Sequence, residues 1–137
     1  MSIEETREFA AIQTDAAPRA IGPYSQAFSV SQGRMVFVSG QIGIDPATAK
    51  MVRGGVPEQA KQVMHNLRAV LEAAGGTLRD IVRTTIYLKN LEDFATVNAV
   101  YASYLEAPYP ARATIEVARL PMDALVEIDA IAVVGDQ

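Results

Sequence analysis

Arg112 is the residue whose type and position most directly suggest chemistry. It follows Pro110 and Ala111 and opens an apolar run that ends at Val117. Alternation along a strand places Arg112 and Thr114 on the same face. A guanidinium presents a fixed fork of donors that matches a carboxylate or a phosphate. The run therefore predicts a receptor for a small anion. The alternative is a surface arginine that is paired with a carboxylate of the chain.

Glu127 is the second candidate, because it lies between Val126 and Ile128 in an otherwise apolar run. A carboxylate in such company either pairs with a cation or has its pKa raised by desolvation, and both occur at functional sites. The alternative is a carboxylate at the sheet rim with a lysine or arginine neighbour. Asp129 lies two residues further on the same face and could be the paired group instead.

Three further polar residues occupy informative places. Asn98 falls on the apolar face of a predicted helix, where an amide must find partners, so it either orients a ligand or ties down a loop. Tyr24 and Ser39 offer hydroxyls at the ends of predicted strands, although each alone is typical of a turn or an edge. Gly40 lets the backbone approach another group closely. The inward positions predicted for the helix of Asn98 are Phe94, Val97, Tyr101, Tyr104 and Leu105.

Composition excludes several kinds of chemistry. Twelve Lys and Arg against sixteen Asp and Glu give a net charge of −4, which argues against nucleic acid as a partner. The chain has no cysteine, so it has no disulfide, thiolate nucleophile or sulfur-ligated metal. The single histidine, His65, lies off the apolar stripe of its predicted helix, and we expect it to be solvated. We therefore expect no metal site.

The sequence also bounds the location of the protein. No apolar run approaches the length of a membrane span, so no membrane partner is expected. The first eight residues are too acidic for a secretory or mitochondrial signal. Together with the absence of cysteine, these features predict a cytoplasmic protein.

The predicted elements follow the order strand, strand, helix, strand, helix, strand, strand. Residues 1–17 are expected to form a loosely attached N-terminal arm, with a short helix capped by Ser2 and Glu5. One domain follows over residues 18–137. Its predicted strands cover 26–30, 35–39, 80–88, 112–117 and 125–134, and its predicted helices cover 57–74 and 90–105. This order indicates an α+β fold, a mixed sheet with two helices on one face.

The other face of that sheet predicts an assembly. Residues 35–38 and 130–134 are apolar at consecutive positions, so both faces of these strands are apolar. Two helices can cover only one face. An uncovered apolar face on the order of several hundred Å² is unusual for a monomer. We therefore expect a closed homo-oligomer that buries the second face.

Taken together, these segments strongly resemble the RidA (YjgF) family of enamine/imine deaminases. The resemblance extends from about residue 17 to residue 134. It implies a chorismate-mutase-like α+β fold and a homotrimer with a central barrel and intersubunit active sites. The matching segments are Ala20 to Ala27, Val38 to Gln41, Glu58-Gln59, Asn66-Leu67, Arg83 to Thr85, Asp93 to Ala95, Val97-Asn98, Pro110 to Arg112, Leu120-Pro121 and Val126 to Ile128.

The resemblance also implies roles for individual residues. Arg112 would anchor the substrate carboxylate, and Glu127 would position water and move protons. The residues implied to line or shape the pocket are Tyr24, Ser39, Asn98 and Thr114, the last of which would help to hold the attacking water.

Three positions depart from the family pattern. Ala113 stands where the motif usually has serine, Arg83 stands in place of a common lysine, and Ala49 replaces the usual glycine of a hairpin after Asp45-Pro46. The first two leave the substrate preference open.

The implied substrate is a small 2-imino or 2-amino-2-enoic acid such as 2-aminoacrylate, a reactive intermediate. Its hydrolysis to a 2-keto acid and ammonia would detoxify it without a cofactor. Two alternatives stay open: a deaminase of a larger catabolic substrate such as 2-aminomuconate, and a non-catalytic protein that binds small acids or acts as a chaperone. Ribonuclease activity, also attached to this family, finds little support in the acidic charge and the single His65.

Overall fold

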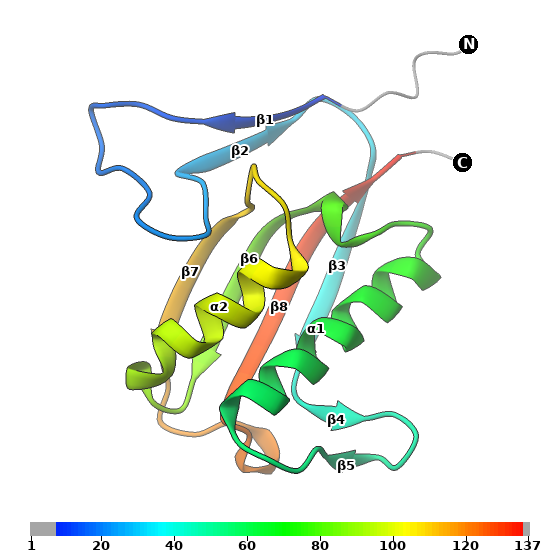
Figure 1. The fold of residues 1–137 in the computed structure, drawn as a ribbon. Helices are drawn as coiled ribbons and strands as arrows, with labels where there is room; N and C mark the ends of the chain where they lie inside the picture. The colour runs from blue at the N-terminus through cyan, green and yellow to red at the C-terminus, as the bar shows by residue number, and fades with distance from the viewer. Residues whose placement is uncertain (1–7, 136–137) are drawn as a thin grey trace.

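The computed structural model describes residues 8–135. Its centre is a four-stranded sheet in the order β3-β8-β6-β7, with two helices on one face (Figure 1). Strand β8 is antiparallel to β3 and β6, whereas β6 and β7 are parallel. The mixed sheet confirms the α+β prediction. The elements are β3 (Arg34–Gln41), α1 (Val56–Ala73), β6 (Ile81–Leu88), α2 (Phe94–Tyr104), β7 (Ala111–Glu116) and β8 (Val126–Val134).

Helix α1 forms where the apolar spacing predicts it, within one residue at each end. Pro57 lies in its first turn, and the carboxylate of Glu58 accepts a hydrogen bond from the Gly55 amide at 3.1 Å, a capping arrangement. Gly75, with φ 87°, ends the helix. The buried stripe of α1 includes Ala60, Val63, Met64, Leu67 and Leu71.

Helix α2 lies over the β6–β7 side of the sheet (Figure 1). A 3-10 turn, η3 (Leu91–Asp93), precedes it, and Asn90 caps this turn by accepting from the Glu92 amide. Val97 and Tyr101 are buried as predicted, but Phe94 is 38% exposed. Phe94 faces the sheet side of the helix and contacts Arg112, as an inward position would, but it is not buried, because the first turn of α2 lies at the sheet edge, where no strand follows β7.

The two faces of the sheet differ as the sequence predicts. Thr84, Ile86 and Leu88 of β6 face the helices and are fully buried. On the opposite face, Met35 and Phe37 of β3 are 57% and 69% exposed. The helices thus cover one face only, and the other face presents large apolar side chains.

Two hairpins flank the sheet. One contains the strand predicted over residues 26–30, but its partner strand is not predicted, and the other is the hairpin that the family resemblance implies after Asp45-Pro46. Strand β1 (Phe9–Ile12) pairs with β2 (Ala27–Val30), and β4 (Ile44–Asp45) pairs with β5 (Lys50–Met51). The side chain of Gln26 bonds the backbone of residues 14, 17 and 18 and so ties part of the expected arm to β2. The expected helix at Ser2–Glu5 lies outside the described residues. The remaining 3-10 turns are η2 (Leu78–Asp80) and η4 (Pro121–Asp123).

Candidate active site

Arg112 lies on the helix-covered face of β7. It is in register with the buried Thr84 of β6, which fixes the direction of its side chain. Its Nη1 donates to the Oδ1 of Asn98 on α2 at 2.8 Å. Asn98 therefore meets the requirement for a partner, and it orients the cation rather than a loop.

Three aromatic rings surround the Arg112 guanidinium. Its Cζ lies 5.3 Å from the ring centroid of Tyr24, 5.4 Å from Tyr101 and 5.6 Å from Phe94. Such contacts are attractive because a ring face carries negative charge density. Burial lowers the pKa of Arg112, while the two tyrosines act in the opposite direction. Arginine stays protonated at neutral pH, so the site holds a permanent, partly desolvated cation.

Tyr101 is the buried member of these three aromatic side chains. Its hydroxyl lies 2.8 Å from the Oγ1 of Thr84, and both side chains are buried. Burial raises the pKa of Tyr101 to about 12, against the opposing effects of the Thr84 hydrogen bond and the Arg112 charge. The phenol is therefore neutral, and it contacts the cation through its ring.

Tyr24 is held by the loops around it. Its hydroxyl accepts from the Ile21 amide at 3.3 Å. The next residue, Ser25, donates through its amide to the Pro110 carbonyl at 3.1 Å and through its hydroxyl to the Tyr109 carbonyl. The segment that carries Tyr24 is thus fixed to the loop that leads into β7.

A cavity of about 260 Å³ opens beside the guanidinium. Tyr24, Phe94, Arg112 and Thr114 line it. The Oγ1 of Thr114 is buried and has no hydrogen-bond partner among the described residues. A buried hydroxyl without a partner is costly, so a ligand or a water molecule in this cavity would satisfy it.

Glu127 lies on the opposite face of the sheet. It is in register with Tyr87 of β6, whose side chain points away from the helices. The backbone of Gly40 lies directly against it, since a Cβ built on Gly40 would be 1.9 Å from the Glu127 Oε2. This close approach falls where the β3–β8 register shifts, between Val38 and Gln41. Gly40 therefore makes room for the carboxylate, and Ser39 is the exposed residue beside it.

The surroundings of Glu127 raise its pKa. Desolvation raises the pKa of Glu127, and the nearby charge of Asp129 raises it further. Asp129 itself accepts a hydrogen bond from the Tyr87 hydroxyl at 2.8 Å. Asp129 is thus the hydrogen-bonded carboxylate of this strand.

The predicted site residues form two clusters within one chain. One, at the edge strand β7 and under α2, contains Arg112, Thr114, Tyr24 and Asn98. The other, on the uncovered face of β3 and β8, contains Glu127 and Ser39. Strand register separates them, because Arg112 and Glu127 point to opposite sides of one sheet.

The sequence did not predict that two aromatic side chains contact Arg112. Phe94 and Tyr101 were assigned to the core, but both rings contact the guanidinium. Their spacing about Asn98 is the signal that could have identified them, because all three share one side of α2.

The structure also shows where the three residues that depart from the family pattern lie. Ala49 has a φ of 60°, in the left-handed region where glycine is favoured. Ala113 pairs with Thr85 on the face opposite to Arg112, and Arg83 is exposed on that same face. The departures at 83 and 113 therefore do not contact the Arg112 cavity.

Among residues 8–135, no group of three or more His, Cys, Asp or Glu side chains could hold a metal ion. His65 is exposed, as predicted, and its Nε2 lies 2.9 Å from the Tyr104 hydroxyl. Within the same residues, no helix has both the length and the hydropathy to cross a membrane.

The fold and the site define the class of this protein. The chain belongs to the Endoribonuclease L-PSP (RidA/YjgF) family, whose model matches residues 14–134. It is 57% identical over 123 residues to Protein DfrA of Myxococcus xanthus, with 90% of this chain and 94% of that protein covered. It is 49% identical over 124 residues to the 2-iminobutanoate/2-iminopropanoate deaminase of Mus musculus, with 90% of each covered.

A solved structure agrees with these relatives. RidA from the Antarctic bacterium Psychrobacter sp. PAMC 21119 is 48% identical, with a TM-score of 0.72, and the match covers 91% of this chain and 99% of that one. The resemblance inferred from the sequence is therefore confirmed.

Proposed function

We propose that this protein is a 2-iminobutanoate/2-iminopropanoate deaminase, a hydrolase that converts small enamine or imine acids such as 2-aminoacrylate to 2-keto acids and ammonia. The observation that carries the proposal is Arg112, a caged and oriented cation at the wall of a small cavity. Relatives at about 48% identity that are named for this activity support it.

Arg112 would bind the substrate carboxylate. Three aromatic rings lie against its planar guanidinium, and Nη1 donates to Asn98, so the remaining N–H groups are available to a carboxylate. The cavity of about 260 Å³ lies beside these N–H groups. A larger substrate such as 2-aminomuconate stays the alternative, and the relative turnover of the two substrates by the assembled protein would distinguish them.

The chemistry then needs one proton shuttle. The enamine tautomerises to the imine, and water adds to the C2 carbon. The resulting carbinolamine loses ammonia to give the 2-keto acid. Glu127 would accept a proton from the water and return it to the leaving nitrogen, and a carboxylate with a raised pKa suits such exchange. A protein that only binds small acids would not need this residue.

We further propose a homotrimer with a central barrel and an active site between subunits. Arg112 and Glu127 of one chain point to opposite faces of its sheet, so a second copy would have to supply one of them. The uncovered face also exposes Met35, Phe37 and Ile115, whose burial would stabilise an assembly.

The test compares variants in the release of ammonia and pyruvate from 2-aminoacrylate generated in situ. Loss of one partner of a desolvated charge pair costs about 2–5 kcal/mol, so Arg112→Ala should lose more than tenfold in kcat/KM. Arg112→Lys should be nearly as damaging, because an ammonium lacks the fork. Arg53→Lys, at an exposed arginine, is the control.

Two outcomes would refute this proposal. Wild-type protein that does not accelerate the reaction would exclude the small-enamine substrate. Near-wild-type turnover of Arg112→Lys would exclude the bidentate anchor. Light scattering tests the assembly separately, and a monomeric mass at micromolar concentration would rule out the trimer.

A further inference from the structure

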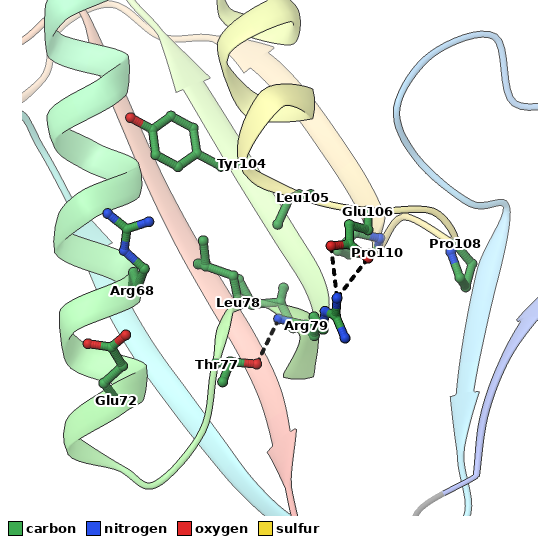
Figure 2. A pocket seen from close by; sticks show the side chains of 11 residues that line it. Arg68, Glu72, Thr77, Leu78, Arg79, Tyr104, Leu105, Glu106, Pro108 and Pro110 are labelled. Carbon is green, nitrogen blue, oxygen red and sulfur yellow. Dashed lines mark hydrogen bonds and ion pairs between the residues drawn. The ribbon is translucent and has the colours of Figure 1, made fainter.

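A second cavity, of about 370 Å³, lies between the C-terminal half of α1 and the segment that follows α2. Figure 2 shows Arg68 and Glu72 on α1 at one side of it, with Leu78 in the middle and the Arg79–Glu106 pair at the other side. It has no residue in common with the Arg112 cavity. Its volume lies within the range of small-molecule sites.

The Arg68 side of this cavity is held in place. Tyr104 is anchored by His65, whose Nε2 lies 2.9 Å from the tyrosine hydroxyl. The Arg68 Cζ in turn lies 5.7 Å from the centroid of the Tyr104 ring. A guanidinium stacked on a ring keeps its N–H edge free, and this edge is the part that recognises a carboxylate.

The charges around the cavity are only partly paired. Arg79 donates from Nη2 to both oxygens of the Glu106 carboxylate, at 2.9 and 3.0 Å, so these two charges are paired with each other. Arg68 and Glu72 lie one helical turn apart, and neither forms an ion pair with a described residue. The cavity therefore presents one unpaired cation and one unpaired anion side by side.

An apolar surface adjoins these two charges. Leu78 and Ile81 are buried, and with Leu105 they form the apolar part of the lining. A ligand with only a carboxylate would meet repulsion from Glu72, and a simple amine would meet repulsion from Arg68. A ligand that carries both groups on one carbon, next to an apolar chain, matches every part of the lining.

We propose that this cavity binds a free α-amino acid with an apolar side chain. Its carboxylate would contact Arg68, its ammonium group would contact Glu72, and its side chain would lie on Leu78 and Leu105. The site does not depend on the proposed deaminase activity. Since Arg68 and Glu72 are both exposed, the affinity should be in the millimolar range.

Calorimetric titration of the assembled, full-length protein with leucine tests this proposal. We expect saturable binding, weakened about tenfold or more in Arg68→Gln and in Glu72→Gln. Lys61→Gln on the same helix and Glu92→Gln on η3 are matched controls that lie outside the cavity and should bind as wild type does. The 2-keto acid and the amine that correspond to leucine each lack one charged group, and both should bind about tenfold or more weakly.

Amide chemical shifts locate the ligand. Leucine should shift the amide resonances of Leu78, Arg79 and Leu105. Shifts confined to Tyr24 and Thr114 would place the bound leucine in the Arg112 cavity and overturn the proposal. Absence of binding up to about 10 mM would also overturn it. If the protein bound the 2-keto acid as tightly as leucine, the cavity would recognise the carboxylate alone, and the proposal that it binds a zwitterionic amino acid would be refuted.

Discussion

Substitution of Gly40 by alanine tests how the Glu127 carboxylate is positioned. A methyl group at Gly40 would lie 1.9 Å from the Glu127 Oε2 and 2.8 Å from its Cδ. To restore a non-bonded contact of roughly 3 Å or more, the carboxylate must move by about 1 Å. The backbone of Gly40 is not in the left-handed region, so alanine adds no strain of its own there.

The expected effect falls on catalysis and not on stability. A misplacement of about 1 Å can cost about a hundredfold in rate, which corresponds to roughly 2.7 kcal/mol in the activation free energy. The Glu127 side chain is flexible and only partly buried, so its displacement should change the free energy of unfolding by less than about 1 kcal/mol. Gly40→Ala should therefore approach the kcat/KM of Glu127→Gln while it remains folded.

The assay is 2-keto acid formation from an imine generated in situ, with urea unfolding and light scattering of each variant. Gly22→Ala is the matched control, because its Cβ would lie 3.7 Å from the Tyr24 ring and 3.9 Å from Arg112, which are ordinary contacts. We expect it to keep kcat/KM within about threefold. The double variant Gly40→Ala/Glu127→Gln should lose little more than Glu127→Gln alone, because both changes act on one group.

Two results would refute this reasoning. A Gly40→Ala protein with wild-type kcat/KM would mean that the position of the Glu127 carboxylate does not matter for turnover. A double variant whose losses simply multiply would mean that Gly40 acts through some other group.

The remaining predictions concern the cation, the proton shuttle and one turn. Asn98→Ala removes a hydrogen bond to a charged group that contributes about 1.5–3 kcal/mol, so KM should rise roughly ten- to a hundredfold; an unchanged KM would show that Arg112 is oriented without it. Because the pKa of Glu127 is raised, its ionised form is lost at a higher pH than for an ordinary glutamate. A pH series should show that kcat/KM falls as the pH decreases through this pKa. In Asp129→Asn the fall should occur at a lower pH, because the charge that raises the pKa is removed. A fall that persists in Glu127→Gln would contradict the role of Glu127 as the proton acceptor. Ala49→Gly should stabilise the protein by about 1 kcal/mol in urea unfolding, since φ is 60° there, and destabilisation would count against that reason.

Local pattern was sufficient for much of the fold. The apolar spacing of α1 and the alternation of β6 to β8 identified these elements within one or two residues, because each follows from a short-range period. The two-residue strands β4 and β5 are too short to carry a period. Strand β1 was missed because its pairing with β2 depends on residues far along the chain.

The candidate site shows the same division. Alternation along β7 correctly placed Arg112 and Thr114 on one face, and a polar residue on an apolar helix face correctly marked Asn98. The aromatic cage around Arg112 was not foreseen, because its rings come from α2 and from a loop near the N-terminus.

The sequence by itself determined which residues of each element share a face and which residue types could bind an acid or move a proton. Only the tertiary structure decided that Arg112 faces α2 while Glu127 faces the uncovered side of the sheet. The periodicity of a strand fixes relations within that strand, whereas the relation between two strands depends on their order and register in the sheet. That order and register arise from hydrogen bonds between segments that are distant in the sequence.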